Sequence, residues 1–375
     1  FVMDFEIWSN DGAILSDLAN DYKLLTIVPE QAYVQAHNVF IKGLDIWLGS
    51  RLYRKNDVHI ADYFYFNSLP GQGLGVMYKN LDTAILVNTG SSPFFQADLN
   101  QGSMAPGVVP EVVKRIRTIF VAQYKYPFGH RSSYVQGLGE FHVVPRLQDA
   151  AHVAPNGLDP QDWGWVLGAK AHFDLGRDQF NDMSFRYGTR IANGAASGRT
   201  TYDTFGDTAL DGTYKGAYGI EVVDHFMWNV GHIFSLNGYG TLHYNRGALD
   251  YVPAAAAVGG PPPVVGPNTR LDFAVGARPV VYLHKMFQLM AEATYQGRKD
   301  EGKPMGTVLK LAIAPTVVPT GSKGDYWARP HIRAMYVFGY YNQAAVDQLQ
   351  SPYLKTAGPT RYAHFIGARA EWWFY

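Results

Sequence analysis

Apolar and polar side chains alternate with a period of two along much of this 375-residue chain. In the last such segment, Ile366, Ala368 and Ala370 fall on one face, and Arg369 and Glu371 fall on the other. Successive side chains of a β-strand point to opposite faces of its sheet, so this alternation predicts strands. Helical periodicity is scarce by comparison. The sequence therefore predicts an all-β, antiparallel fold.

The polar face of these segments carries charges, which favours a membrane barrel over a soluble sheet. Phe185 and Tyr187 alternate with Arg186 and Arg190, and residues 271–278 repeat the pattern. Transmembrane β-barrels have an apolar outside, a polar lumen and aromatic girdles at the strand ends. Aromatic residues do gather at 336–341 and 372–375. We expect a transmembrane antiparallel β-barrel, with a half-buried sheet of a soluble protein as the alternative.

Long segments rich in Gly, Pro, Asn and Asp separate the expected strands. The clearest cover residues 89–107, 193–216, 251–268 and 342–360. Such connections are uncommon in compact soluble domains but typical of the outer side of a barrel, whose turns at the other end are short. No internal repeat or boundary is visible, so residues 1–375 are expected to form one domain.

Composition and motifs exclude several classes of protein. Lys plus Arg and Asp plus Glu both number 32, which is not the basic balance of a nucleic-acid-binding protein. There is no cysteine, and the 12 histidines lack ligand spacing, so we expect no metal and no cofactor. No G-x-S-x-G or H-E-x-x-H motif points to an enzyme. The glycines at 71–75 are expected to form a turn.

Several blocks resemble one known family. Residues 46–67 read IWLGSRLYRKNDVHIADYFYFN, and residues 327–333 read WARPHIR. Shorter matches lie at 223–225, 276–279 and 367–374. These blocks are similar to segments of the maltoporin (LamB-type) sugar porins, and the resemblance spans nearly the whole chain. In the first block, the residues in register are Gly49, Arg51, Tyr53, Asp57, Val58, His59, Asp62 and Tyr65.

The resemblance implies a barrel of about eighteen strands, of which sixteen are visible in this sequence. The polar lumen would be constricted by an inward-folded loop around Arg51–Phe66. The first residues resemble the family's third strand, so its opening hairpin is missing here. Unpaired edges are very costly in lipid, and we expect a preceding part of the chain to supply that hairpin; closure with fewer strands is the alternative.

The resemblance also implies a function: passive, selective diffusion of carbohydrates, maltodextrin-like or other oligosaccharides, across the outer membrane of a Gram-negative bacterium. The expected assembly is a homotrimer in contact with outer-membrane lipid and lipopolysaccharide. A bacteriophage receptor role is known in the family, but nothing in these loops supports it. The alternatives are a general diffusion porin and a soluble all-β protein that binds or cleaves glycans.

The family's sugar-binding residues can be placed on this sequence. An aromatic slide, on which sugar rings stack, maps to Tyr22, Trp327 and Trp373. A polar track and constriction map to Glu30, Arg51, Lys55, Asp57, Asp62 and Phe64. Phe64 replaces a tyrosine of the family pattern, and Glu30 replaces an arginine. Both changes put a preference for maltodextrins in doubt, but not sugar transport in general.

Overall fold

The computed structural model describes residues 1–8, 26–54, 56–88, 116–129, 131–146, 160–194, 201–250, 267–321 and 323–372. Most of these residues lie in one 16-stranded sheet. Its strands are β1 (Val2–Trp8), β2 (Thr26–Ala36), β3 (Leu44–Arg54), β6 (Ser68–Tyr78), β7 (Leu81–Asn88), β8 (Arg117–Pro127), β9 (Tyr134–Val144), β10 (Asp162–Gly176), β11 (Gln179–Thr189), β12 (Tyr218–Val230), β13 (Phe234–Arg246), β14 (Thr269–His284), β15 (Phe287–Asp300), β16 (Gly306–Val317), β17 (His331–Tyr341) and β18 (Tyr362–Glu371).

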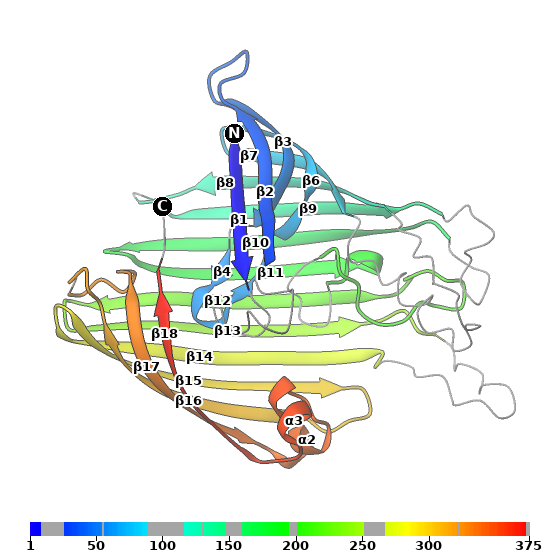
Figure 1. Ribbon diagram of the computed structural model, residues 1–375. Coiled ribbons are helices and arrows are strands. Elements are labelled where there is room, and N and C mark those ends of the chain that lie inside the picture. The colour runs from blue at the N-terminus through cyan, green and yellow to red at the C-terminus, as the bar shows by residue number, and fades with distance from the viewer. Residues whose placement is uncertain are drawn as a thin grey trace, which may run out of the picture.

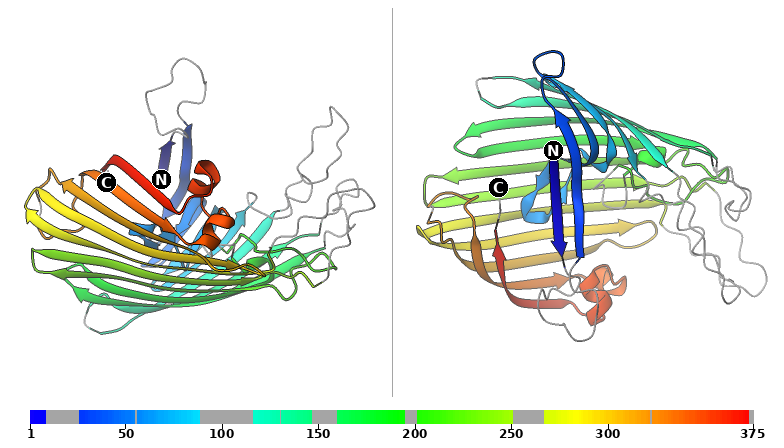
Figure 2. Two further views of the ribbon diagram at one scale, coloured as in Figure 1. Left: turned by 90° about the horizontal axis from the view of Figure 1, so that it is seen from below. Right: turned by 45° about the horizontal axis from the view of Figure 1, so that its top comes forward.

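Every strand of the sheet pairs antiparallel with its neighbours in the sequence, except that β3 pairs with β6 across an inserted segment. That segment contains a two-stranded ribbon, β4 (Asp57–Val58) and β5 (Tyr63–Phe64). The sheet curves strongly, and its concave side encloses the ribbon (Figure 1, Figure 2). The all-β antiparallel fold and the sixteen visible strands are therefore confirmed. We call the concave side the lumen.

The sheet order begins at β1 and ends at β18, and the described residues contain no ladder between these two edge strands. The connection from β17 to β18 holds two short helices, α2 (Gln343–Asp347) and α3 (Pro352–Ala357). Asn342 and Ser351 cap their first turns by accepting hydrogen bonds from backbone amides. No helix in the described ranges is long and apolar enough to cross a membrane.

The two faces of the sheet follow the period-two pattern. Phe185 is 47% exposed on the convex side, whereas its neighbour Arg186 is 3% exposed in the lumen. Large apolar side chains stand exposed along the convex side, among them Leu48, Ile85, Phe120, Phe141, Leu167, Val222, Leu242, Val275 and Leu311. A water-facing sheet would not leave such a continuous apolar surface uncovered, but a lipid-facing one requires it.

The glycines expected to form a turn lie instead within β6. Gly75 faces Trp47 on β3, and a Cβ atom at Gly75 would lie 2.1 Å from Trp47 Nε1. A Cβ atom at Gly73 would lie 2.2 Å from the carbonyl oxygen of Ile85. Glycine is needed here because neighbouring groups approach the backbone closely. The prediction of a turn was wrong because glycine signals both situations in a sequence.

Replacing Gly75 by alanine is therefore expected to destabilise the fold by about 1–3 kcal/mol, the usual cost of overpacking. Trp47 is fully buried and stacks on Tyr53, so it has little freedom to move away. Chemical denaturation in detergent, followed by tryptophan fluorescence, measures the change. Gly137→Ala is the matched control, because its new Cβ atom meets nothing within 4 Å. Equal midpoints for the two variants would contradict the packing argument.

Candidate functional site

The chain between β3 and β6 turns into the lumen. Residues 56–67 form the β4–β5 ribbon and a single 3-10 turn, His59–Ala61, between its strands. Asp62 ends this turn in the left-handed conformation, with φ of 47°, which Asp adopts more readily than most residues. Figure 1 shows the segment lying across the concave side, in front of β11–β13. We call it the inward loop; it begins after Arg54, slightly later than the sequence suggested.

Glu221 on β12 fixes the middle of the inward loop. Its carboxylate accepts hydrogen bonds from the Tyr63 hydroxyl at 3.0 Å and from the Phe66 amide at 3.1 Å. Arg186 on β11 donates to the same carboxylate at 2.9 Å and to the Phe66 carbonyl at 3.0 Å. His243 on β13 also contacts the Tyr63 hydroxyl. One buried carboxylate thus joins three donors from loop and wall.

Asp182 on β11 forms a second anchor. It accepts from the Tyr65 hydroxyl at 3.3 Å, and Lys170 on β10 lies 3.0 Å from it. His172 lies 2.6 Å from its other oxygen. Lys170 also donates to the side chain of Asn56 at the start of the loop. Buried charges are stable only when they are paired in this way, so the network holds the loop in one position.

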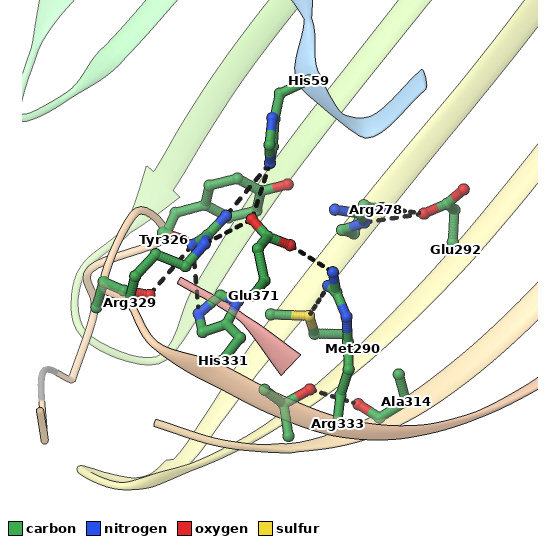
Figure 3. Close-up of polar contacts among 12 residues, drawn as sticks. His59, Arg278, Met290, Glu292, Ala314, Tyr326, Arg329, His331, Arg333 and Glu371 are labelled. Atoms are coloured by element: carbon green, nitrogen blue, oxygen red, sulfur yellow. Dashed lines mark hydrogen bonds and ion pairs between the residues drawn. The ribbon is translucent and has the colours of Figure 1, made fainter. Parts of the chain in front are cut away.

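The third anchor lies near the end of the chain. Glu371 on β18 accepts hydrogen bonds from Arg329 at 2.7 Å and from Arg333 at 2.5 Å. His59 of the inward loop lies 3.2 Å from the same carboxylate. Figure 3 shows Glu371 between these three groups. The inward loop therefore contacts the sheet from β10 to β18, and Glu371 faces the lumen as its place in the alternation predicts.

A hollow of about 420 Å³ lies against the inward loop. Its walls combine aromatic rings with charged and polar groups, including Trp327, Tyr134, Phe180, Asp57, Lys170 and His225. Trp327 is held edge-to-face against Tyr326, with ring centroids 4.9 Å apart. Aromatic faces pack on the apolar faces of sugar rings, while charged groups form strong hydrogen bonds with hydroxyls. The hollow therefore has the chemistry of a sugar-ring site.

Two of the predicted site residues meet in this hollow. Trp327 and Asp57 both line it, although 270 positions separate them in the sequence. Arg51 lies on β3 before the loop, where its guanidinium is 4.8 Å from the centre of the Tyr33 ring and 5.1 Å from that of Trp47. Arg51 does not line the hollow.

The remaining predicted residues are more dispersed. Asp62 is exposed at the tip of the inward loop, and Phe64 is half-buried and pairs with Asp57 in the ribbon. Glu30 lies in β2, but its side chain is outside the described part of the structure. Tyr22, Lys55 and Trp373 also lie outside the described residues. The expected roles of these four side chains stay predictions.

The anchoring residues on the sheet were missed at the sequence level. Glu221, Asp182 and Lys170 each lie on a lumen-facing position of an alternating segment. Their positions in the alternation of apolar and polar residues indicated that these side chains face the lumen. Nothing in the sequence, however, says which of the many inward charges meets a loop more than 100 residues away.

Two tyrosines of the inward loop have altered acidity. Burial raises the pKa of Tyr63 well above its usual range, and the charge of Glu221 adds to this. Burial and the charge of Asp182 likewise raise the pKa of Tyr65. Both phenols therefore stay protonated and keep donating their hydrogen bonds. Because the docked pKa exceeds the undocked value, their stabilisation of the loop is complete below that value, about 10, and declines above it.

We therefore expect the ion conductance of the reconstituted protein to be steady from neutral pH to about pH 10 and to change only above it. Loop docking should weaken there as the undocked tyrosines lose their protons. Planar-bilayer recordings across this range provide the measurement. The double variant Tyr63→Phe/Tyr65→Phe should lose the alkaline change. A change centred between pH 5 and 7 would instead implicate other groups and contradict this assignment.

Comparison with known families identifies a match that covers almost the whole chain. The model of the LamB porin family matches residues 8–374. The matched region includes the inward loop, the hollow and the three anchors, so the match covers the site as well as the fold. It agrees with the resemblance seen in the blocks at 46–67 and 327–333.

Proposed function

The chain belongs to the LamB porin family, and from this membership we propose that it is a passive pore selective for oligosaccharides. Those of the maltodextrin type are the first candidates, although Phe64 and Glu30 depart from the family pattern. The family consists of carbohydrate-selective outer-membrane channels. The single observation that carries the finer proposal is the hollow beside the inward loop, where Trp327 faces charged and polar side chains. A general pore for small solutes has no need of an aromatic ring held in such a place.

The proposed mechanism uses weak and repeated binding. The Trp327 ring offers a face for the apolar side of a sugar. Asp57, which is exposed, and His172, whose side chain is 21% exposed, lie where hydroxyls can exchange hydrogen bonds with them. Conduction requires sites that bind well enough to admit the solute and weakly enough to release it. The anchored loop keeps the passage narrow, so that a sugar chain touches these groups as it passes.

We extend the proposal to the other residues of the family pattern. Tyr22 and Trp373 would continue the aromatic slide of Trp327. A polar track would comprise Glu30, Arg51, Lys55, Asp57, Asp62 and Phe64. The protein would act as a homotrimer of single-domain subunits, with lipid and lipopolysaccharide against the apolar convex side. That exposed apolar surface supports the contact with lipid.

Uptake into proteoliposomes tests this function. We expect maltodextrins to enter at rates that saturate with concentration. Protein-free liposomes provide the baseline. Rates that depend only on solute size, with no saturation, would contradict sugar selectivity and indicate a general diffusion porin.

A further inference from the structure

Three ion pairs join β14 and β15 on the lumen side, away from the strands that carry the Glu221 and Asp182 anchors. Each pair links an arginine on one strand to a carboxylate on the other: Arg270 to Asp300 at 2.5 Å, Arg298 to Asp272 at 2.6 Å, and Arg278 to Glu292 at 2.6 Å. Their nitrogen and oxygen atoms are within hydrogen-bond distance, so these are direct contacts.

The signs of the charges alternate along both strands. Arg270, Asp272 and Arg278 follow one another on β14, and the facing positions of β15 carry the opposite charges. Every positive group thus has a negative neighbour across the strands, and the fields of the pairs cancel at a distance. These six side chains offer strong hydrogen-bond donors and acceptors side by side, and their charges sum to zero.

Members of these ion pairs are more exposed than the buried pair that anchors the inward loop. The side chains of Arg186 and Glu221 at the loop anchor are only 4% and 3% exposed. Arg298 is 38% exposed and Glu292 is 29% exposed. The Arg270–Asp300 pair is more enclosed, because the Arg270 guanidinium lies 5.6 Å from the ring centre of Phe205. In the other two pairs, Arg298 and Glu292 therefore keep polar atoms available to a solute in the lumen, while their partners Asp272 and Arg278 are 17% and 15% exposed.

We propose that Arg278–Glu292 and Arg298–Asp272 form a second hydroxyl-binding track, which selects neutral polyols over charged solutes. This inference rests on the proposed function, because it assumes that sugars enter the lumen. A sugar hydroxyl both donates and accepts, so it can bridge the arginine and the carboxylate of one pair. An ion gains little from the track, because the attraction of one member is offset by the repulsion of the other.

The matched test is the double variant Arg278→Gln/Glu292→Gln. It removes both charges, leaves the net charge unchanged and keeps two neutral amides that form weaker hydrogen bonds. We expect the maltohexaose concentration that half-blocks the ion current in a planar bilayer to rise about fivefold. The ratio of cation to anion permeability, from the reversal potential, should stay as in the wild type.

The single variants test the balance of charge. Arg278→Gln leaves Glu292 without its partner and should shift the permeability ratio towards cations. Glu292→Gln should shift it towards anions. Lys299→Gln is the control, because Lys299 is exposed at the next position of β15, where side chains point to the convex side. It should change neither selectivity nor sugar block.

The outcomes separate this track from the function on which it rests. If maltohexaose does not block the wild-type current, the proposed function fails and the track fails with it. If it blocks the wild type and the double variant at the same concentration, the track alone is refuted. Arg298→Gln/Asp272→Asn should reproduce the weakened block, so that the result does not depend on how one variant folds.

Discussion

Replacing Glu221 by alanine is expected to release the inward loop and to enlarge the pore. Tyr63 and Phe66 would lose their shared acceptor, and the buried Arg186 would lose the carboxylate 2.9 Å from it. Removing one partner of a buried ion pair typically costs about 3–5 kcal/mol. Single-channel recordings should show a larger conductance than that of the wild type, with a weaker block by maltohexaose.

Two further variants make this result specific. Glu221→Gln keeps an acceptor oxygen for the loop but removes the negative charge that pairs with Arg186, so we expect an intermediate conductance. Glu301→Ala removes an exposed carboxylate that accepts a hydrogen bond from the Asn268 amide at 3.1 Å, far from the inward loop in the sheet order, and it should leave the pore unchanged. Wild-type conductance and sugar block in a folded Glu221→Ala protein would show that this anchor does not hold the constriction.

Replacing Trp327 by alanine should weaken sugar binding about tenfold. A sugar face that covers roughly 60 Å² of the ring gains about 1.5 kcal/mol from apolar burial, which corresponds to that factor. The concentration dependence of current block by maltohexaose measures the change. The conductance without sugar should rise only slightly, because Trp327 lies in the connection between β16 and β17 and meets the inward loop at the ring of His59, 5.8 Å away between centroids, while Glu221 and Asp182 keep their contacts with the loop.

Trp228 provides the matched control for this prediction. It lies on β12 and is 48% exposed, and its replacement by alanine removes the same side chain without touching the hollow. Trp327→Tyr should recover part of the binding, because an aromatic face remains. A Trp327→Ala variant that binds maltohexaose as tightly as the Trp228→Ala variant would exclude Trp327 from the sugar path.

Local patterns in the sequence predicted the architecture well, because a strand in a barrel wall has only two environments. The alternation around Phe185 and Arg186 assigned each side chain to lipid or lumen correctly. The same alternation placed Glu371 on the lumen side and Trp372 on the convex side, where Trp372 is 63% exposed. The local pattern at 71–75 misled, because the close approach of Trp47 depends on how two strands pair.

The site could be predicted only in part. Asp57 and Trp327 carried recognisable local motifs, and both line the hollow. The anchors at Glu221 and Asp182 could not be predicted, since each depends on how far the inward loop reaches across the lumen. Their partners Tyr63 and Tyr65 looked like ordinary neighbours of Phe64, yet their hydroxyls join the loop to the wall.

The most direct test of the account is the current through single channels of the wild-type protein in a planar bilayer, recorded while maltohexaose is added. The account predicts a steady current that the sugar blocks saturably and reversibly, because the anchored loop forces each sugar chain past Trp327 and its polar neighbours. A large current that no concentration of maltohexaose or any other oligosaccharide reduces would contradict it.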